Sequence, residues 1–397
     1  MATLELLDVA EGGTVSVSIV GVGEVPPAWR DERSVVGLVV DAVRRALDDA
    51  GIDAADVDGF TSEAQSVLGR ARPDEVAVAI GSRDRRFSAH SSIAGSGVLG
   101  AIQLGVLALE AGLADVVVSY YGLSLSRAEL GPYSIHAEDP IKAALEMPYG
   151  YFGQPVYFAM LAQRYRHEFG LTDEQLGAVP IAARAWAQRT PDALKREPLD
   201  IEGYLQDRVV ADPLRRLDCC LINDAAAAVV LTRDDRAADA RHRPVRVAGM
   251  GFGTKPVTES DYFTQNPQFL EMASVDSGRR AFAAAELTPA DVDVAEIYDC
   301  FTMSVILQLE DLGFAAKGEG AELVASGAIA PGGALPVNTH GGLLSHSYSV
   351  GAGHVVEAVR QLRHERGEAQ VPGAEVAVVT GLGAMDHATM LLTVGGR

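Results

Sequence analysis

An internal repeat constrains the fold of this chain more than any other feature of its sequence. Arg-Arg-Ala at 44–46 is followed by Ala-Asp-Val-Asp at 55–58, and Arg-Arg-Ala at 279–281 is followed, with the same spacing, by Ala-Asp-Val-Asp at 290–293. Self-similarity at a fixed spacing indicates a duplicated architecture. We therefore expect two similar halves that pack together.

Each half also begins and ends in the same way. Both begin with an apolar segment interrupted by glycine, and both end in a buried strand that stops at glycine. These four segments span residues 17–23, 112–122, 245–251 and 373–383. Helical patterns at 34–47 and 355–362 alternate with such segments. Continuous Val and Ala strands are typical of parallel sheets that helices cover on both faces, so the sequence predicts an α/β fold with parallel strands.

The region between the halves has a different character. Residues 123–218 are rich in Tyr, Pro, Arg and Gln and include a helical pattern at 156–166. Because long connections inside compact domains are usually functional, we expect an inserted loop subdomain that covers the substrate. The predicted order is an N-terminal half, the insertion, the end of the first half and a C-terminal half. These four segments are 1–122, 123–218, 219–243 and 244–397.

Composition excludes several classes of function. The net charge of -21 repels nucleic acid and anionic membrane surfaces. No apolar run approaches the ~20 residues that a membrane helix needs, and the N-terminus lacks the pattern of a signal peptide, so we expect a cytoplasmic protein. Cys219, Cys220 and Cys300 form no CxxC pair, which predicts neither a disulfide framework nor structural zinc. We interpret all three as structural.

Four motifs carry a resemblance to a known family. They are IYDCF at 297–301, VNTHGG at 337–342, GGLLSHSYSVG at 341–351, and QLR at 361–363 followed by GLG at 381–383. Together with the repeat, they resemble the thiolase superfamily over essentially the whole chain, and in particular its sterol-carrier-protein thiolase and lipid-transfer-protein branch. The resemblance implies a five-layered αβαβα fold made of two repeated halves with an inserted loop subdomain.

The residues that thiolases need for acyl transfer are missing. A thiolase carries a cysteine nucleophile near the start of a helix in its first half, where the helix dipole lowers the thiol pKa. The resemblance places Gly95 at that position, and no cysteine precedes Cys219. Tyr298 and Tyr348 stand where the family has catalytic histidines, and 379–380 holds Val-Thr in place of the second cysteine region. Acyl transfer through an acyl-enzyme is therefore predicted to be impossible.

The two tyrosines suggest a different reaction. A phenol with a pKa of ~10 is mainly a proton donor at neutral pH. The sequence resembles a lipid-transfer-protein-type subgroup of aldolases that remove propionyl-CoA from steroid thioesters. That resemblance implies retro-aldol cleavage of a tertiary β-hydroxyacyl-CoA to a ketone and a short acyl-CoA. One of Tyr298 and Tyr348 would protonate the enolate and the other would remove the hydroxyl proton, with the assignment left open.

Neighbouring residues supply further candidates. Asn338 and His340 lie in the loop where the family builds an oxyanion site. Asp299 is expected either to orient a partner or to cap a helix, and His346 either to tune Tyr348 or to face solvent. The insertion offers arginines as candidates for CoA phosphates by location alone, namely Arg164, Arg166 and Arg184. We expect no metal and no covalently bound cofactor, with CoA only as part of the substrate.

Two other functions remain open. One is a thiolase-fold acyltransferase with another nucleophile, for which Ser91 or Cys300 would have to serve; a pairing of Ser91 with His90 is disfavoured, because adjacent strand residues rarely face each other. The other is a non-catalytic subunit that binds acyl-CoA for a partner. The resemblance also implies a homodimer that joins two copies of a small OB-fold, acyl-CoA-binding partner in a heterotetramer.

Overall fold

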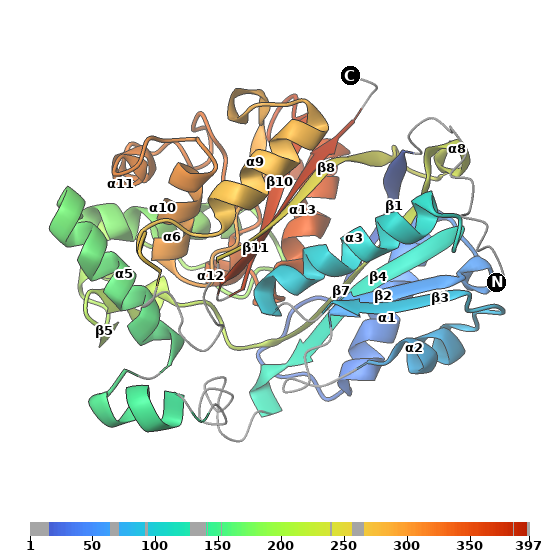
Figure 1. Cartoon of the computed structure of the whole chain (residues 1–397), viewed down its shortest axis with the longest axis horizontal. Coiled ribbons are helices and arrows are strands. Elements are labelled where there is room, and N and C mark those ends of the chain that lie inside the picture. The colour runs from blue at the N-terminus through green and yellow to red at the C-terminus, as the bar shows by residue number, and fades with distance from the viewer. Residues whose placement is uncertain are drawn as a thin grey trace, which may run out of the picture.

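The computed structural model describes residues 16–63, 71–91, 94–127, 140, 142–151, 153–238, 240–255, 266–383 and 385–394 (Figure 1). Within these ranges one sheet of nine strands has the order β3-β2-β4-β7-β1-β8-β11-β10-β9. The first half of the chain supplies β1 Val17–Glu24, β2 Gly59–Glu63, β3 Phe87–Ser91, β4 Val116–Ser124 and β7 Asp224–Arg233. The second half supplies β8 Val245–Thr254, β9 Val294–Glu296, β10 Val376–Leu382 and β11 Asp386–Thr393.

The predicted duplication is visible in the order of the elements. In the first half β1 leads into helix α1 (Val35–Ala50) and then β2, and in the second half β8 leads into α9 (Ser274–Ala285) and then β9. The two half-sheets join where β1 and β8 pair in antiparallel fashion, with Ser18 opposite Arg246.

The glycines in the first strand of each half have a packing role. A Cβ on Gly23 would lie 2.2 Å from the Ala42 carbonyl oxygen of α1, and one on Gly251 would lie 2.1 Å from the Ser277 carbonyl oxygen of α9. Only glycine lets each helix lie this close to its strand. The repeated glycine pattern therefore reflects the same helix-on-strand packing in both halves.

The elements form five layers. Helices α1 and α2 (Pro73–Ile80) cover the outer face of the first half-sheet, and α9 covers the outer face of the second. Helix α3 (Gly97–Glu110) contacts β2 and β4 as well as β10 and β11, and α13 (Ala352–Leu362) contacts β1 and β7 as well as β9 and β10. Both central helices thus lie between the half-sheets, which confirms the thiolase-like αβαβα fold (Figure 1).

The expectation of a parallel sheet is wrong. Strands β2, β3 and β4 are parallel to one another, as are β9 and β10, but β7 and β1 pair antiparallel, and so do β8, β11 and β10. The continuous apolar pattern was a sign of burial on both faces, and helices bury both faces whatever the strand direction.

The described part of the insertion contains several helices, one of which covers the helical pattern predicted at 156–166. It contains α5 Gln154–Phe169, α6 Asp173–Ala187, α7 Ile201–Leu205 and the small hairpin of β5 Val209–Ala211 and β6 Leu214–Arg215. Helices α5 and α6 pack against α10 (Thr302–Asp311), and α6 also contacts α11 (Gly320–Ala325) and α12 (Gly342–Ser345). The short helix α8 spans Asp234–Ala237. The limits of the four predicted segments, and a role of the insertion in covering substrate, remain proposals.

No helix in the described ranges combines the length and the apolar character that crossing a membrane requires.

Candidate active site

The structure brings the two predicted tyrosines together. Tyr298 follows β9 and is 3% exposed, and Tyr348 lies half-buried in the loop between α12 and α13. Their hydroxyl oxygens are 3.5 Å apart, although the residues are separated by 50 positions in the sequence. Two phenols therefore face each other at one point.

Hydrogen bonds on both sides of its backbone hold Tyr298 in place. Its N–H donates to Thr380 Oγ1 at 2.8 Å, and its carbonyl oxygen accepts from Gln308 Nε2 at 2.8 Å and Ser304 Oγ at 3.0 Å. Burial raises the pKa of Tyr298 well above its usual value, and the charge of Tyr348 acts in the same direction. Tyr298 therefore stays protonated at neutral pH, so that it can act as a proton or hydrogen-bond donor but not as a base.

The position that the resemblance assigns to the missing nucleophile lies against Tyr298. Gly95 belongs to a short turn at 94–96 that leads directly into α3. A Cβ on Gly95 would lie 2.8 Å from Tyr298 Oη and 2.0 Å from the Leu382 carbonyl oxygen. The volume in which a nucleophilic side chain would begin is thus filled by the phenol and a backbone carbonyl.

An asparagine that the sequence analysis did not single out positions Tyr348. Asn223, fully buried directly before β7, accepts from the Tyr348 N–H through Oδ1 at 2.8 Å and donates to Ser347 Oγ at 3.1 Å. The available signal was a polar Asn-Asp pair at 223–224 that precedes a run of buried small residues.

Asp299 caps a helix, the second of its two expected roles. Its carboxylate accepts from the Leu343 N–H at 2.8 Å and the Leu344 N–H at 3.3 Å, at the first turn of α12. A Cβ on Gly342, whose φ is +61°, would lie 2.1 Å from Asp299 Oδ2, so glycine lets the helix start directly on the carboxylate. His354 Nε2 lies 3.1 Å from Asp299 Oδ1.

Asn338 is tied to the backbone beside Tyr298. Its Oδ1 accepts from the Ile297 N–H at 2.7 Å, and its Nδ2 donates to the Ile297 carbonyl oxygen at 2.8 Å. Asn338 itself has a positive φ of 52°. With both ends of the amide engaged by Ile297, the geometry favours orientation of the neighbouring Tyr298 over direct binding of an oxyanion.

His340 lies in a buried group of histidines. Its ring centroid is 4.8 Å from that of His346 and 5.1 Å from that of His354, and its Nδ1 is 3.3 Å from Glu296 Oε2. Neither ring nitrogen of His340 has a hydrogen-bond partner among the described residues. Burial lowers the pKa of His340 well below its usual value, so the ring is neutral at physiological pH.

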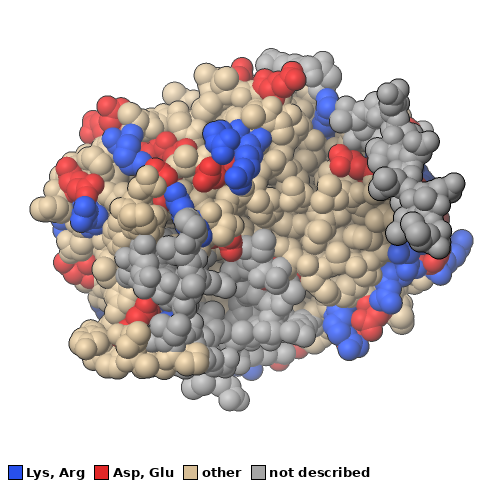
Figure 2. All heavy atoms as spheres, in the orientation of Figure 1, with Lys and Arg blue, Asp and Glu red and all other residues tan. Residues whose placement is uncertain are grey.

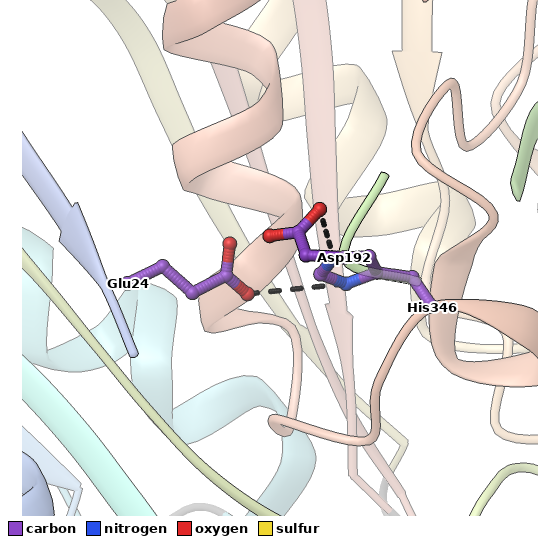
Figure 3. Close-up of side chains that lie close together, drawn as sticks. All are labelled: Glu24, Asp192 and His346. Atoms are coloured by element: carbon purple, nitrogen blue, oxygen red, sulfur yellow. Dashed lines mark ion pairs between the residues drawn. The ribbon is translucent and has the colours of Figure 1, made fainter. Parts of the chain in front are cut away.

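His346 lies between two carboxylates, a group that we call the carboxylate clamp: Glu24, His346 and Asp192 (Figure 3). His346 Nδ1 is 3.9 Å from Glu24 Oε1, and Nε2 is 3.6 Å from Asp192 Oδ1. Burial lowers the pKa of His346, but the two carboxylates outweigh burial and raise it overall. The ring is 2% exposed, which excludes the alternative that it faces solvent.

The carboxylate clamp joins three distant segments. Glu24 ends β1, Asp192 follows α6 in the insertion, and His346 comes two residues before Tyr348. The insertion is also held by backbone bonds, because the Leu194 N–H donates to the His346 carbonyl oxygen at 3.1 Å. The insertion therefore supports the loop that carries Tyr348. Glu24 and Asp192 were both missed by the sequence analysis.

The same three residues could in principle hold a metal ion, because their ligand atoms lie within 4.8 Å of one another. However, each ring nitrogen of His346 is nearest to a different carboxylate. One ion would have to bind a single nitrogen, so the arrangement favours a protonated histidine that bridges two carboxylates. The absence of a metal stays a prediction.

The alternative nucleophiles are poorly placed. Burial raises the pKa of Cys300 above its usual value, and the pKa of Cys219 to about 12, which leaves little thiolate. Ser91 is buried against α3, where a Cβ on Gly100 would lie 2.3 Å from Ser91 Oγ. The exposed His90 bonds to Ser62 at the other face of the strand. These surroundings give an acyltransferase no evident nucleophile in the part of the chain that the structure describes.

The arginines of the insertion already have protein partners. Arg164 pairs with Glu168, and Arg166 pairs with Asp173. Arg184 is buried and donates to Ser345 Oγ at 3.1 Å, so it supports α12. On the face drawn in Figure 2, acidic and basic side chains lie beside one another and do not gather by sign. The residues that bind the CoA phosphates are therefore not assigned.

Comparisons with known proteins agree with this geometry. Residues 256–394 match the family model described as "Thiolase C-terminal domain-like". A protein named 17-hydroxy-3-oxo-4-pregnene-20-carboxyl-CoA lyase from Mycobacterium tuberculosis is 36% identical over 359 residues, covering 87% of this chain and 91% of the relative. A protein named steroid side-chain-cleaving aldolase from Thermomonospora curvata is 33% identical over 361 residues, covering 88% and 90%.

A solved structure gives the same result. The chain in the structure called "Ltp2-ChsH2(DUF35) aldolase" has a TM-score of 0.89 and 30% identity, covering 96% of this chain and 98% of that one. The fold, the filled nucleophile position and these relatives lead to one conclusion. The chain belongs to the thiolase superfamily, in the branch of that superfamily that contains CoA-thioester aldolases, and it is a carbon-carbon lyase.

Proposed function

We propose that this protein cleaves a tertiary β-hydroxyacyl-CoA, a steroid side-chain thioester, by a retro-aldol reaction that releases a ketone and a short acyl-CoA such as propionyl-CoA. One observation carries the proposal. Two phenols 3.5 Å apart occupy the place where acyl transfer would need a cysteine, and one of them fills the space beside Gly95. The names of the two relatives, a CoA lyase and an aldolase, support the same reaction class.

The reaction needs one proton acceptor and one proton donor. Removal of the hydroxyl proton lets the bond between the α and β carbons break, the β carbon becomes a ketone, and the electron pair moves into the thioester enolate. Protonation of the α carbon completes the reaction. Tyr298 is assigned the donor role, because burial raises its pKa and keeps its proton in place. Tyr348 is assigned the role of receiving the hydroxyl proton.

The surrounding residues position this pair. Asn338, Thr380 and Gln308 fix the backbone around Tyr298. Asn223 and the carboxylate clamp fix the loop of Tyr348. CoA takes part only as a portion of the substrate, and the proposal needs no metal and no covalently bound cofactor.

The proposed assembly follows the similar solved structure, whose title names ChsH2(DUF35) beside the aldolase. We propose a cytoplasmic homodimer that joins two copies of a small OB-fold, acyl-CoA-binding partner in a heterotetramer. Light scattering of the chain with and without such a partner measures this assembly directly. A monodisperse monomer with full activity on its own contradicts it.

The test of the reaction is incubation of the assembled protein with a steroid β-hydroxyacyl-CoA. A ketone and a short acyl-CoA, formed in equal amounts and identified by mass spectrometry, are expected. Transfer of the acyl group to free CoA or to the protein instead indicates an acyltransferase. Binding of the thioester without any product indicates a non-catalytic subunit, and either outcome overturns the proposal.

A further inference from the structure

A buried histidine of the second half belongs to the hydrogen-bond network around Tyr298. His387 lies on β11 and is fully buried, and its Nε2 is 3.0 Å from Gln308 Oε1. Gln308, on α10, is also fully buried and donates to the Tyr298 carbonyl oxygen at 2.8 Å. One side chain therefore separates His387 from the backbone of Tyr298.

The Gln308 amide can take only one orientation. Its Nε2 lies 2.8 Å from the carbonyl oxygens of both Tyr298 and Ser304, which can only accept. Its Oε1 therefore faces Thr380 and His387, and Thr380 Oγ1 donates to it at 2.7 Å. The same Thr380 oxygen accepts from the Tyr298 N–H. Gln308 thus supports the carbonyl group of Tyr298 directly and its N–H group through Thr380.

The orientation of Gln308 decides which nitrogen of His387 carries the hydrogen. Because Gln308 Oε1 can only accept, His387 Nε2 must be the donor. The other ring nitrogen, Nδ1, lies 2.6 Å from Ser277 Oγ on α9. Burial lowers the pKa of His387 to about 3, so the ring is neutral and Nδ1 accepts from the Ser277 hydroxyl. His387 is therefore held from α9 on one side and holds Gln308 on the other.

We propose that His387 is a positioning residue for the cleavage reaction: as the Nε2–H tautomer it holds the Gln308 amide in place, and through that amide it fixes the backbone of Tyr298. This inference rests on the proposed retro-aldol function, in which Tyr298 is the proton donor. His387 acts only through Gln308 and exchanges no proton with the substrate. The chain of hydrogen bonds joins α9, on the outer face of the second half-sheet, to the site.

A role in folding alone makes a different prediction. The groups of this chain are buried, so the loss of any one of their hydrogen bonds lowers thermal stability. If His387 only packs β11 against α9, its substitutions lower the thermal midpoint and leave kcat of the folded protein unchanged. Positioning predicts instead that kcat depends on which ring nitrogen the new side chain replaces.

Three substitutions of His387 in the assembled protein separate the two ring nitrogens. His387→Gln places an amide nitrogen near the position of Nε2 and can still donate to Gln308, so kcat is expected to stay near the wild-type value. His387→Asn reaches only the position of Nδ1, and His387→Leu donates to nothing. A displacement of roughly half an ångström at Tyr298 costs about tenfold in rate, so both variants are expected to lower kcat about tenfold with little change in KM.

The matched control is Ser274→Ala on the same helix. It removes a different buried hydrogen bond of α9, from Ser274 Oγ to Asp311 Oδ2 at 2.6 Å. The thermal midpoint is expected to fall, as for His387→Leu, while kcat stays unchanged.

Two further measurements are independent of the loss of stability. In the Tyr298→Phe background, His387→Leu is expected to lower the remaining kcat by much less than tenfold, because the hydroxyl that it helps to position is gone. Nitrogen-15 NMR of labelled histidine rings, with the His387 signals identified by their loss in His387→Gln, is expected to show a neutral ring with its hydrogen on Nε2 between about pH 5 and pH 8.

The outcomes are distinct. Wild-type cleavage with His387→Leu at full kcat, or equal losses of kcat in His387→Leu and His387→Gln, overturns the role of His387 and leaves the aldolase proposal intact. A hydrogen on Nδ1, or an undiminished effect in the Tyr298→Phe background, does the same. If His387→Leu fails to fold, the comparison of His387→Gln with His387→Asn decides. Absence of cleavage by the wild-type protein overturns the function and this role together, whichever nitrogen carries the hydrogen.

Discussion

Replacement of Gly95 by alanine tests whether the nucleophile position has been filled. The new Cβ would lie 2.0 Å from the Leu382 carbonyl oxygen and 2.8 Å from Tyr298 Oη. The new carbon and the carbonyl oxygen at 2.0 Å must separate by on the order of 1 Å before repulsion ends, and the carbon and Tyr298 Oη at 2.8 Å by roughly half of that. Leu382 ends β10 and cannot move freely, so the strain falls on Tyr298 and on the turn before α3. Overpacking of this kind lowers the free energy of unfolding by about 3 kcal/mol.

Turnover is expected to fall more sharply than stability. A displacement of about 1 Å in a reacting group costs roughly 10²-fold in rate, and Gly95→Ala displaces the proposed proton donor by a large part of that, because the new Cβ crowds both Tyr298 and the adjacent turn. The matched control is Gly37→Ala in the first turn of α1, where the nearest atoms to the new Cβ lie at 3.5 Å. Gly37→Ala is expected to leave the midpoint of thermal unfolding and kcat near wild-type values.

The assay measures ketone release and the thermal midpoint for the wild type and both variants. If Gly95→Ala retains wild-type stability and turnover, the space beside Tyr298 is open and the explanation for the lost nucleophile is wrong. Gly95→Cys extends the test, because the same crowding should prevent a reactive thiolate from forming there. An acyl adduct on that cysteine refutes the reasoning.

Three further predictions concern the chemistry and its support. Incubation with a 3-ketoacyl-CoA is expected to give neither thiolysis nor an acyl adduct, and a mass shift of the intact protein contradicts this. Glu24 and Asp192 outweigh burial and raise the pKa of His346. The positive charge of the protonated ring therefore stabilises the fold fully below about pH 6.5, and this stabilisation is lost as the pH rises through the raised pKa. The free energy of unfolding of the wild-type protein should therefore fall as the pH rises above about 6.5, whereas that of His346→Asn should not. Parallel stability profiles of the two proteins would disprove the bridge that His346 forms between Glu24 and Asp192. Asn223→Ala leaves the Tyr348 N–H unpaired, which costs about 1–3 kcal/mol. Because the loop would then hold Tyr348 less firmly, turnover should fall at least tenfold. An unchanged kcat excludes the positioning role of Asn223.

Local patterns predicted several of the elements. The helical pattern at 34–47 corresponds to α1, and the structure shows the Ser34 Oγ accepting from the Gly37 N–H at its start. The glycine-interrupted strands were found in both halves because the packing of a helix on its strand requires those glycines. Strand direction was not predictable in the same way, because burial of both faces gives one pattern for parallel and antiparallel strands alike.

The tyrosine pair was predictable because each tyrosine lies in a motif that carries the family resemblance. Their supporting residues were not, because contacts across the fold define them. Asn223 and Tyr348 are 125 positions apart and are joined by two hydrogen bonds, from the Tyr348 N–H to Asn223 Oδ1 at 2.8 Å and from Asn223 Nδ2 to the Tyr348 carbonyl oxygen at 3.5 Å. Glu24 and Asp192 meet His346 only when β1, the insertion and the Tyr348 loop pack together. No local spacing carries that information.

For Asp299 the sequence limits the expected role to two alternatives but does not decide between them. A carboxylate after a buried strand was expected either to orient a partner or to cap a helix. The tight turn at Gly341-Gly342, both with positive φ, places the first N–H groups of α12 on Asp299. The backbone conformation of these two glycines makes capping one role of Asp299, and its contact with His354 Nε2 at 3.1 Å shows that the same carboxylate also orients a side chain.

The turnover of Tyr298→Phe and Tyr348→Phe tests the central claim most directly. Each substitution keeps nearly all of the ring volume, so thermal stability should change little, while kcat for cleavage of a steroid β-hydroxyacyl-CoA should fall about 10²-fold or more. Because the two hydroxyls lie 3.5 Å apart and act in one proton-transfer sequence, the double variant should be much less impaired than the product of the single effects. Near-normal kcat in both single variants would show that the tyrosines only pack the site, and would contradict the proposal that they carry the protons of the reaction.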